Sequence, residues 1–329
     1  MLLHSRRNAL NRITSDSPTE CPITESRERY TSVVRLFVTV IIIAGLVACN
    51  PEDESDDAGV KVRISEVASG DDSVKSQLDA AIAGRWRDPA NVARDHWRHP
   101  AQTLSFFGVK SDQTVIEIVP AGGWYTEILA PFLRMHGHYI AAVIDPATAI
   151  NSASRCYYLK QIKTLKRKLA VSRKIYGTPE VRYFDESNPV FGAPGSADIL
   201  VTFRNVHNWR NVDTVEKMFQ GFFDVLKSGG TLGLVEHRAK VDGGADNNSG
   251  YIGQDQVIAW AIAAGFVLEE SSEINANPAD TKDHEGGVRS LPPTFGLGNK
   301  DRDKYAAIGE SDRMTLRFRK PATVLNGVH

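Results

Sequence analysis

Apolar stretches rich in β-branched residues alternate with amphipathic stretches along residues 114–319. The first kind is typical of buried strands, and the second of helices that cover a sheet. The expected strands are 114–119, 139–144, 181–184, 198–203, 231–235, 266–274 and 314–319. The expected helices are 126–135, 157–171, 212–226 and 254–264. Strands that alternate with helices of this length favour parallel βαβ units with helices on both faces, so the predicted fold class is α/β.

A glycine turn follows the first expected strand, in the stretch EIVPAGGWYTEILAP at residues 117–131. Such a turn directs free backbone N–H groups and the positive end of the next helix at whatever lies above the strand. Its small residues also let a ligand approach closely. In open α/β sheets the ligand lies beyond the carboxyl ends of the strands, which is where this turn is expected. The pattern therefore predicts a nucleotide-like ligand.

Acidic residues end the second and third expected strands. Asp145 closes AAVID, and Asp185 closes VRYFD. A carboxylate at the end of the second strand commonly accepts hydrogen bonds from ribose hydroxyl groups, and an adenine or its ribose lies near the third. Each aspartate alone could equally cap a turn or helix. Their combination with the glycine turn favours a nucleoside ligand.

Several longer motifs resemble the class I S-adenosylmethionine-dependent methyltransferases. They are VIEIVPAGGWYTEIL, DILVTFRNVHNW and VLKSGGTLGLVEH. Within that superfamily, GGWYTEILAP, EHRA and ESDRMTLRFRKP are similar to a bacterial group of predicted methyltransferases that often carry export signals. The resemblance spans residues 86–321. It implies a Rossmann-like, doubly wound sheet of seven strands with the last strand antiparallel, in three α/β/α layers.

The same resemblance implies that S-adenosylmethionine is the cofactor and that a small molecule is the methyl acceptor. The implied cofactor-binding residues are Glu117, Ala121, Gly122, Gly123, Tyr125, Thr126, Asp145, Asp185, Phe203 and Arg204. One departure concerns the glycine turn, because Val119 and Ala121 stand where the family usually has glycine. A side chain at a position that needs a positive φ costs about 1 kcal/mol. We therefore expect weaker cofactor binding or a re-aimed turn.

Methyl transfer from a sulfonium mainly requires alignment, and a general base only where the acceptor carries a proton. His207 is the candidate base, since histidine titrates near neutral pH and follows the fourth strand. It could instead cap the next helix or pack on a neighbouring aromatic ring. The candidate substrate contacts are Asn205, Asn208, Trp209, His237 and Arg238. No metal site is predicted, because His136 and His138, the one pair with chelate spacing, are expected at the opposite edge of the sheet.

The composition restricts the possible partners. The formal net charge of the 329 residues is −1, and no stretch combines dense basic and aromatic residues. We therefore expect no nucleic-acid partner. The sequence does not indicate an oligomeric state. Residues 275–313 are too long and too rich in glycine for a simple hairpin turn, so they form either a lid or a disordered segment. We expect residues 284–289 to shape substrate access.

The amino-terminal region resembles an export signal. Twelve uncharged residues, 36–47, follow several arginines, and LVAC at 46–49 resembles the lipobox of bacterial lipoproteins. This order predicts a lipid on Cys49 and a membrane-anchored lipoprotein of the bacterial cell envelope. The alternatives are a short hydrophobic anchor or core helix, and a misplaced start site with a cytoplasmic protein.

The predicted organisation is a polar extension and signal peptide at 1–48, an acidic tether at 49–75, a methyltransferase-like domain at 76–323 and a tail at 324–329. The leading functional prediction is an S-adenosylmethionine-dependent methyltransferase of unidentified acceptor. The alternative is a lipid-tethered, catalytically inactive binding protein that retains the fold. A nicotinamide dehydrogenase is disfavoured, since the chain lacks the pattern Gly-x-Gly-x-x-Gly.

Overall fold

The structure is a computed structural model that describes residues 70–240 and 248–322. Its centre is a seven-stranded sheet with the strand order β3-β2-β1-β4-β5-β7-β6. The strands are β1 (Thr114–Ile118), β2 (His138–Ile144), β3 (Glu180–Phe184), β4 (Ala197–Phe203), β5 (Leu226–His237), β6 (Val267–Ser272) and β7 (Arg313–Arg319). Only β7 runs antiparallel to its neighbours, β5 and β6. The α/β class and the antiparallel last strand are confirmed.

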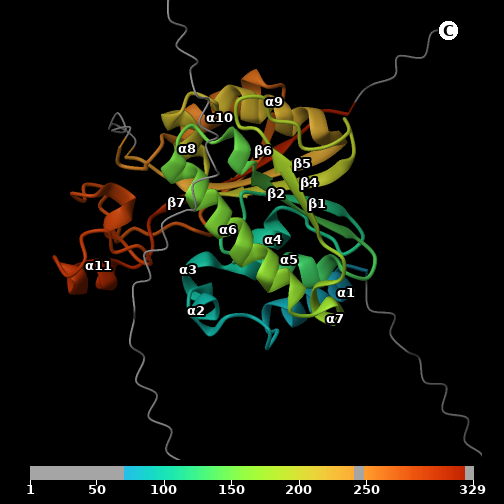
Figure 1. Ribbon diagram of the computed structural model, residues 1–329, viewed down its shortest axis with the longest axis horizontal. Helices are drawn as coiled ribbons and strands as arrows, with labels where there is room; N and C mark the ends of the chain where they lie inside the picture. The colour runs from blue at the N-terminus through green and yellow to red at the C-terminus, as the bar shows by residue number, and fades with distance from the viewer. Residues whose placement is uncertain (1–69, 241–247, 323–329) are drawn as a thin grey trace, which may run out of the picture. The chain divides into compact units, whose positions relative to one another are not determined.

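Helices cover both faces of the sheet, as expected for a doubly wound fold. They are α1 (Gly70–Ile82), α2 (Pro89–Val92), α3 (Asp95–Arg98), α4 (Pro100–Phe106), α5 (Thr126–Leu133), α6 (Ser152–Ala170), α7 (Arg173–Tyr176), α8 (Val206–Asn211), α9 (Val215–Val225), α10 (Gln254–Ala263) and α11 (Arg302–Ile308), with the 3-10 turns η1 (Pro146–Thr148) and η2 (Gly287–Ser290). Helices α8, α9 and α10 lie on one side of the sheet, and α1, α4 and α5 on the other (Figure 1). Each side has its own hydrophobic cluster against the sheet.

Helix boundaries differ from the sequence-based expectation at two places. Helix α6 begins at Ser152 rather than near residue 157, because the Asn151 side chain accepts a hydrogen bond from the Ser154 amide at 2.8 Å and caps the helix. The expected helix 212–226 starts only at Val215, since Asp213 has a φ of 58° and interrupts the chain after α8. The core strands themselves lie within a residue or two of the prediction, except β5, which extends back to Leu226.

The amino-terminal predictions lie mostly outside the described residues. The apolar run 36–47, Cys49 and the tail 324–329 cannot be compared with the structure. Helix α1 begins at Gly70, so the last residues of the expected tether 49–75 are helical. Within residues 70–240 and 248–322, every helix is too short or too polar to cross a membrane.

Candidate active site

The glycine turn after β1 has three residues in the left-handed region. The φ angles are 47° at Val119, 50° at Ala121 and 78° at Gly123. A positive φ is costly for alanine and more so for a β-branched valine. At Gly123 a Cβ would also lie 3.2 Å from Leu165 Cδ1, so glycine is needed there. The turn therefore keeps the backbone path of a glycine-rich loop although two of its residues carry side chains.

Restoring glycine in this turn is expected to stabilise the protein. We expect Ala121→Gly to raise the free energy of unfolding by about 0.5–1 kcal/mol, because relief of the left-handed strain exceeds the added entropy of the unfolded chain. Ala93→Gly is the matched control, since exposed Ala93 has a φ of −56° and should lose about 0.5–1 kcal/mol. Urea denaturation measures both variants. Equal losses in the two would show that the turn is unstrained.

Glu117 lies beneath the turn, where it holds the start of α5. Its carboxylate accepts hydrogen bonds from Tyr139 at 2.5 Å and from the Thr126 hydroxyl at 2.9 Å. Burial raises the pKa of Glu117 to about 7, although these hydrogen bonds and the charge of Lys168 oppose the rise. The implied cofactor residues Glu117 and Thr126 thus contact each other, and both are fully buried.

The raised pKa of Glu117 predicts a specific pH dependence of stability. The folded protein binds this proton more tightly than the unfolded chain, so the free energy of unfolding should decrease as pH rises from the ordinary pKa of 4.5 to about 7. The full shift corresponds to about 3 kcal/mol, of which about 2 kcal/mol should be lost between pH 5 and pH 7.5. Glu117→Gln should remove that decrease while keeping a hydrogen-bond acceptor. The measurement is urea denaturation of both proteins at pH 5 and pH 7.5, and parallel pH profiles would refute the assignment.

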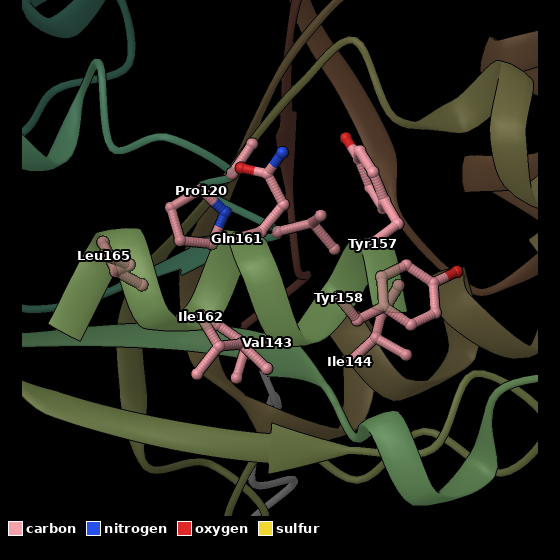
Figure 2. A pocket seen from close by; sticks show the side chains of 10 residues that line it. Pro120, Val143, Ile144, Tyr157, Tyr158, Gln161, Ile162 and Leu165 are labelled. Atoms are coloured by element: carbon pink, nitrogen blue, oxygen red, sulfur yellow. The ribbon is translucent and has the colours of Figure 1, made fainter. Parts of the chain in front are cut away.

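An apolar pocket adjoins the glycine turn on the side of β2 and α6. Its lining includes Val119–Ala121, the β2 residues Val143 and Ile144, and Tyr157, Tyr158 and Gln161 of α6. Figure 2 shows the α6 side chains beside Pro120 and the end of β2. The walls are mostly apolar, which favours the apolar part of a ligand over a charged group.

The two aspartates predicted to bind a nucleoside also shape local turns. Asp145 directly follows β2, and its Oδ1 accepts a hydrogen bond from the Ala147 amide at 2.9 Å. Asp185 accepts from both the amide and the hydroxyl of Ser187 at 2.8 Å. Each aspartate therefore caps a turn, which is one of the two roles that the sequence allowed. The Oδ2 of each carboxylate makes no hydrogen bond within the described residues, which leaves it available to a ligand.

His207 pairs with Glu236, a residue not predicted from the sequence. The Nδ1 of His207, at the start of α8, lies 3.0 Å from Oε1 of Glu236 near the end of β5. Glu236 is completely buried and also accepts hydrogen bonds from the backbone amides of His207 and His237. A carboxylate fixed in this way holds the imidazole in one orientation and favours the tautomer with Nε2 unprotonated.

The predicted substrate contacts are mostly engaged inside the protein. Buried Asn205 donates to the Ile118 carbonyl and to Thr202, and Trp209 lies in the hydrophobic core. Arg238 forms ion pairs with Asp312 and Glu273. His237 lies 2.5 Å from the Ser311 hydroxyl, with its ring centroid 5.2 Å from that of His207. Asn208 is exposed on α8.

Two further implied cofactor residues connect the turn with β4: Tyr125 precedes α5, and Phe203 is the last residue of β4. The rings of Tyr125 and Phe203 stack with centroids 3.6 Å apart. Burial raises the pKa of Tyr125 to about 12, although nearby arginine charges oppose the rise. Arg204 directly follows Phe203 and has a φ of 62°. The backbone at the end of β4 is therefore as constrained as the glycine turn.

The residues His207, Glu236 and His237 also form a group of potential metal ligands. One ligand atom from each lies within 4.8 Å of the others. Positive charge surrounds this group. Burial is the largest cause that lowers the pKa of His237, followed by His207 and then by the arginines Arg204, Arg313 and Arg98. Their positive charge opposes a divalent cation here. The prediction of no metal site considered only His136 and His138, so this group was not among the residues it weighed.

Comparisons with known proteins concern the fold. The chain matches no family model and no curated protein. A SAM-dependent methyltransferase from Aquifex aeolicus is 15% identical, with a TM-score of 0.44 over 75% of this chain and 98% of that one. A putative sarcosine dimethylglycine methyltransferase from Galdieria sulphuraria is 16% identical, with a TM-score of 0.48 over 71% and 88%. The [4+2]-cyclase SpnF is 15% identical, with a TM-score of 0.48 over 76% and 93%. These similarities concern the fold alone. The seven-stranded sheet and its antiparallel β7 are those that the resemblance in the sequence implied.

Proposed function

We propose that the protein is an S-adenosylmethionine-dependent methyltransferase that deprotonates its acceptor with His207. The observation that carries the proposal is the 3.0 Å contact between His207 Nδ1 and the buried carboxylate of Glu236. With Nδ1–H donating to Glu236, Nε2 of His207 can accept a proton from a hydroxyl or amine. Glu236 then stabilises the imidazolium that forms.

The residues around the glycine turn suit the implied cofactor. The apolar pocket between the turn and α6 would hold the adenine ring, and the free Oδ2 of Asp145 would accept from the ribose. The bound cofactor supplies the methyl group from its sulfonium. The chain's own task is to orient the acceptor, exclude water and take up the acceptor proton at His207 Nε2.

A second candidate is a catalytically inactive binding protein with the same fold. The strained Val119 and Ala121 favour it, because side chains in the turn can weaken cofactor binding. We also propose, from the sequence alone, that lipid on Cys49 tethers the protein to the cell envelope. Cys49 lies outside the described residues.

Label transfer distinguishes an enzyme from an inactive binding protein. The full-length protein is incubated with S-adenosylmethionine carrying a tritiated methyl group and a small-molecule extract of bacterial cells. The proposal predicts a labelled product that is absent with His207→Asn. Cofactor binding without any labelled product would support the inactive binding protein.

A further inference from the structure

Three arginines pair with one carboxylate at the carboxyl edge of the sheet, and a fourth lies beside them. The Nε atom of Arg94 lies 2.7 Å from Glu310 Oε1, and the Nε of Arg98 lies 3.1 Å from Oε2. The Nη1 of Arg313 also lies 3.1 Å from Oε2. Arg204 adjoins these residues without pairing with Glu310: it follows Phe203, whose ring stacks on Tyr125 at 3.6 Å, and the Tyr125 hydroxyl donates to the Arg98 carbonyl at 3.4 Å. We call these five residues the arginine cluster, and they leave a surplus of positive charge.

Two members of the cluster have donors without protein partners. Arg98 is 2% exposed, and its Nη2 is buried with no hydrogen-bond partner. The Arg204 guanidinium makes no hydrogen bond or ion pair with any described residue, although it is only partly exposed. Buried donors are nearly always satisfied in folded proteins, and an unpaired charge is costlier still. The Arg98 guanidinium lies over the Trp124 ring, 4.8 Å from its centroid, so partly exposed Arg204 is the member of the cluster that an anionic ligand can reach.

The arginine cluster adjoins the proposed base. Arg204 precedes His207 by three residues at the end of β4, and Ser311, the neighbour of Glu310, contacts His237. The rings of His237 and His207 are 5.2 Å apart between centroids. An anion at Arg204 would therefore lie within one small molecule's length of His207.

We propose that the methyl acceptor carries an anionic group, a carboxylate or a phosphate, that binds to Arg204. Its negative charge would offset the surplus positive charge of Arg98 and Arg313. This inference rests on the proposed function and names the substrate class. The guanidinium of Arg204 offers parallel N–H donors that match the geometry of such groups. The anion would hold the acceptor with its hydroxyl or amine toward His207 Nε2.

Charge favours an acceptor anion over the alternatives. A divalent metal ion at His207, Glu236 and His237 would be repelled by the arginines. The carboxylate of the cofactor is the other candidate partner of Arg204, a residue that the sequence resemblance implied for the cofactor. The ammonium and sulfonium groups leave the cofactor positive, however, so it brings no net negative charge. An acceptor anion does.

The first test measures anion binding to the full-length protein saturated with S-adenosylhomocysteine. The probes are benzoate, its neutral counterpart benzamide, and inorganic phosphate, all titrated by calorimetry at millimolar concentrations. We expect benzoate or phosphate to bind at least about 10-fold tighter than benzamide, and Arg204→Gln to abolish the difference. Arg173→Gln, at an exposed position in α7, is the matched control and should keep the preference. Equal binding of all three probes would overturn the inference.

The second test separates an acceptor anion from the cofactor's own carboxylate. We compare S-adenosylhomocysteine with 5′-methylthioadenosine, which lacks the amino-acid part, on wild type and Arg204→Gln. The inference predicts that Arg204→Gln changes the dissociation constant of either ligand by less than about 3-fold. If Arg204→Gln weakens only S-adenosylhomocysteine by about 10-fold or more, Arg204 binds the cofactor and the inference is wrong. If wild type binds neither nucleoside, the proposed function fails and the inference fails with it. A preference of the unliganded protein for benzoate or phosphate would then show an anion site without methyl transfer.

Discussion

Glu236→Gln is expected to slow methyl transfer by about 100-fold or more, the usual scale for impairing a general base. Glutamine keeps the shape of the side chain, but it cannot stabilise the imidazolium formed at His207. The affinity for S-adenosylhomocysteine should stay within about 0.5 kcal/mol, because Glu236 is buried behind His207 and does not line the pocket at the glycine turn. The rate is measured as single-turnover methyl transfer to the acceptor that the label-transfer experiment identifies.

The variants of the pair separate catalysis from structure. His207→Asn should slow the reaction to a similar extent, and the double variant His207→Asn/Glu236→Gln should be little slower than either, because the two residues act as one unit. Glu216→Gln, at an exposed position in α9, is the control and should leave the rate unchanged. Thermal melts correct each rate for the folded fraction. Additive losses, or a normal rate per folded molecule, would contradict the role of this pair.

Glu310→Gln is expected to lower the free energy of unfolding by about 3–5 kcal/mol, the usual loss when one partner of a buried ion pair is removed. Glu310 is 3% exposed and is the carboxylate that Arg94, Arg98 and Arg313 share. Burial alone would raise its pKa, but the arginine charges lower it to about 2. Its contribution to stability should therefore be complete above its ordinary pKa of 4.5 and be lost as pH decreases toward 2.

Urea denaturation at neutral pH measures this loss. Glu269→Gln is the matched control, since Glu269 pairs with Arg317 and Arg319 near the surface and should change stability by less than about 1 kcal/mol. Phosphate should partly restore the stability of Glu310→Gln, because an anion would replace the missing carboxylate. Equal effects of the two substitutions would show that the arginine cluster does not depend on Glu310.

The sheet was predictable because its information is local. β-branched runs and short connections define β1 to β5, and the confirmed positive φ of Ala121 follows from its place in the turn. Glu236 was within reach of the same reasoning, since it precedes His237 at the end of β5. What the sequence could not show is which side chain the buried carboxylate would contact.

The arginine cluster was not predictable for a different reason. Arg94 and Arg98 contact Glu310 across 216 and 212 residues of sequence. The segment 275–313 was expected to be a lid or disordered, yet it brings Glu310 and Ser311 to the site just before β7. Contacts of this kind depend on tertiary packing, which no local pattern encodes.

The central claim, that this fold binds S-adenosylmethionine, is tested most directly by calorimetric titration of the full-length protein with S-adenosylmethionine and S-adenosylhomocysteine. The account predicts saturable binding of both, weakened about 10-fold or more by Asp145→Ala, the usual loss for a charge-assisted hydrogen bond to the ribose. Absence of binding by either ligand at millimolar concentration, with a normal thermal melt, would contradict it.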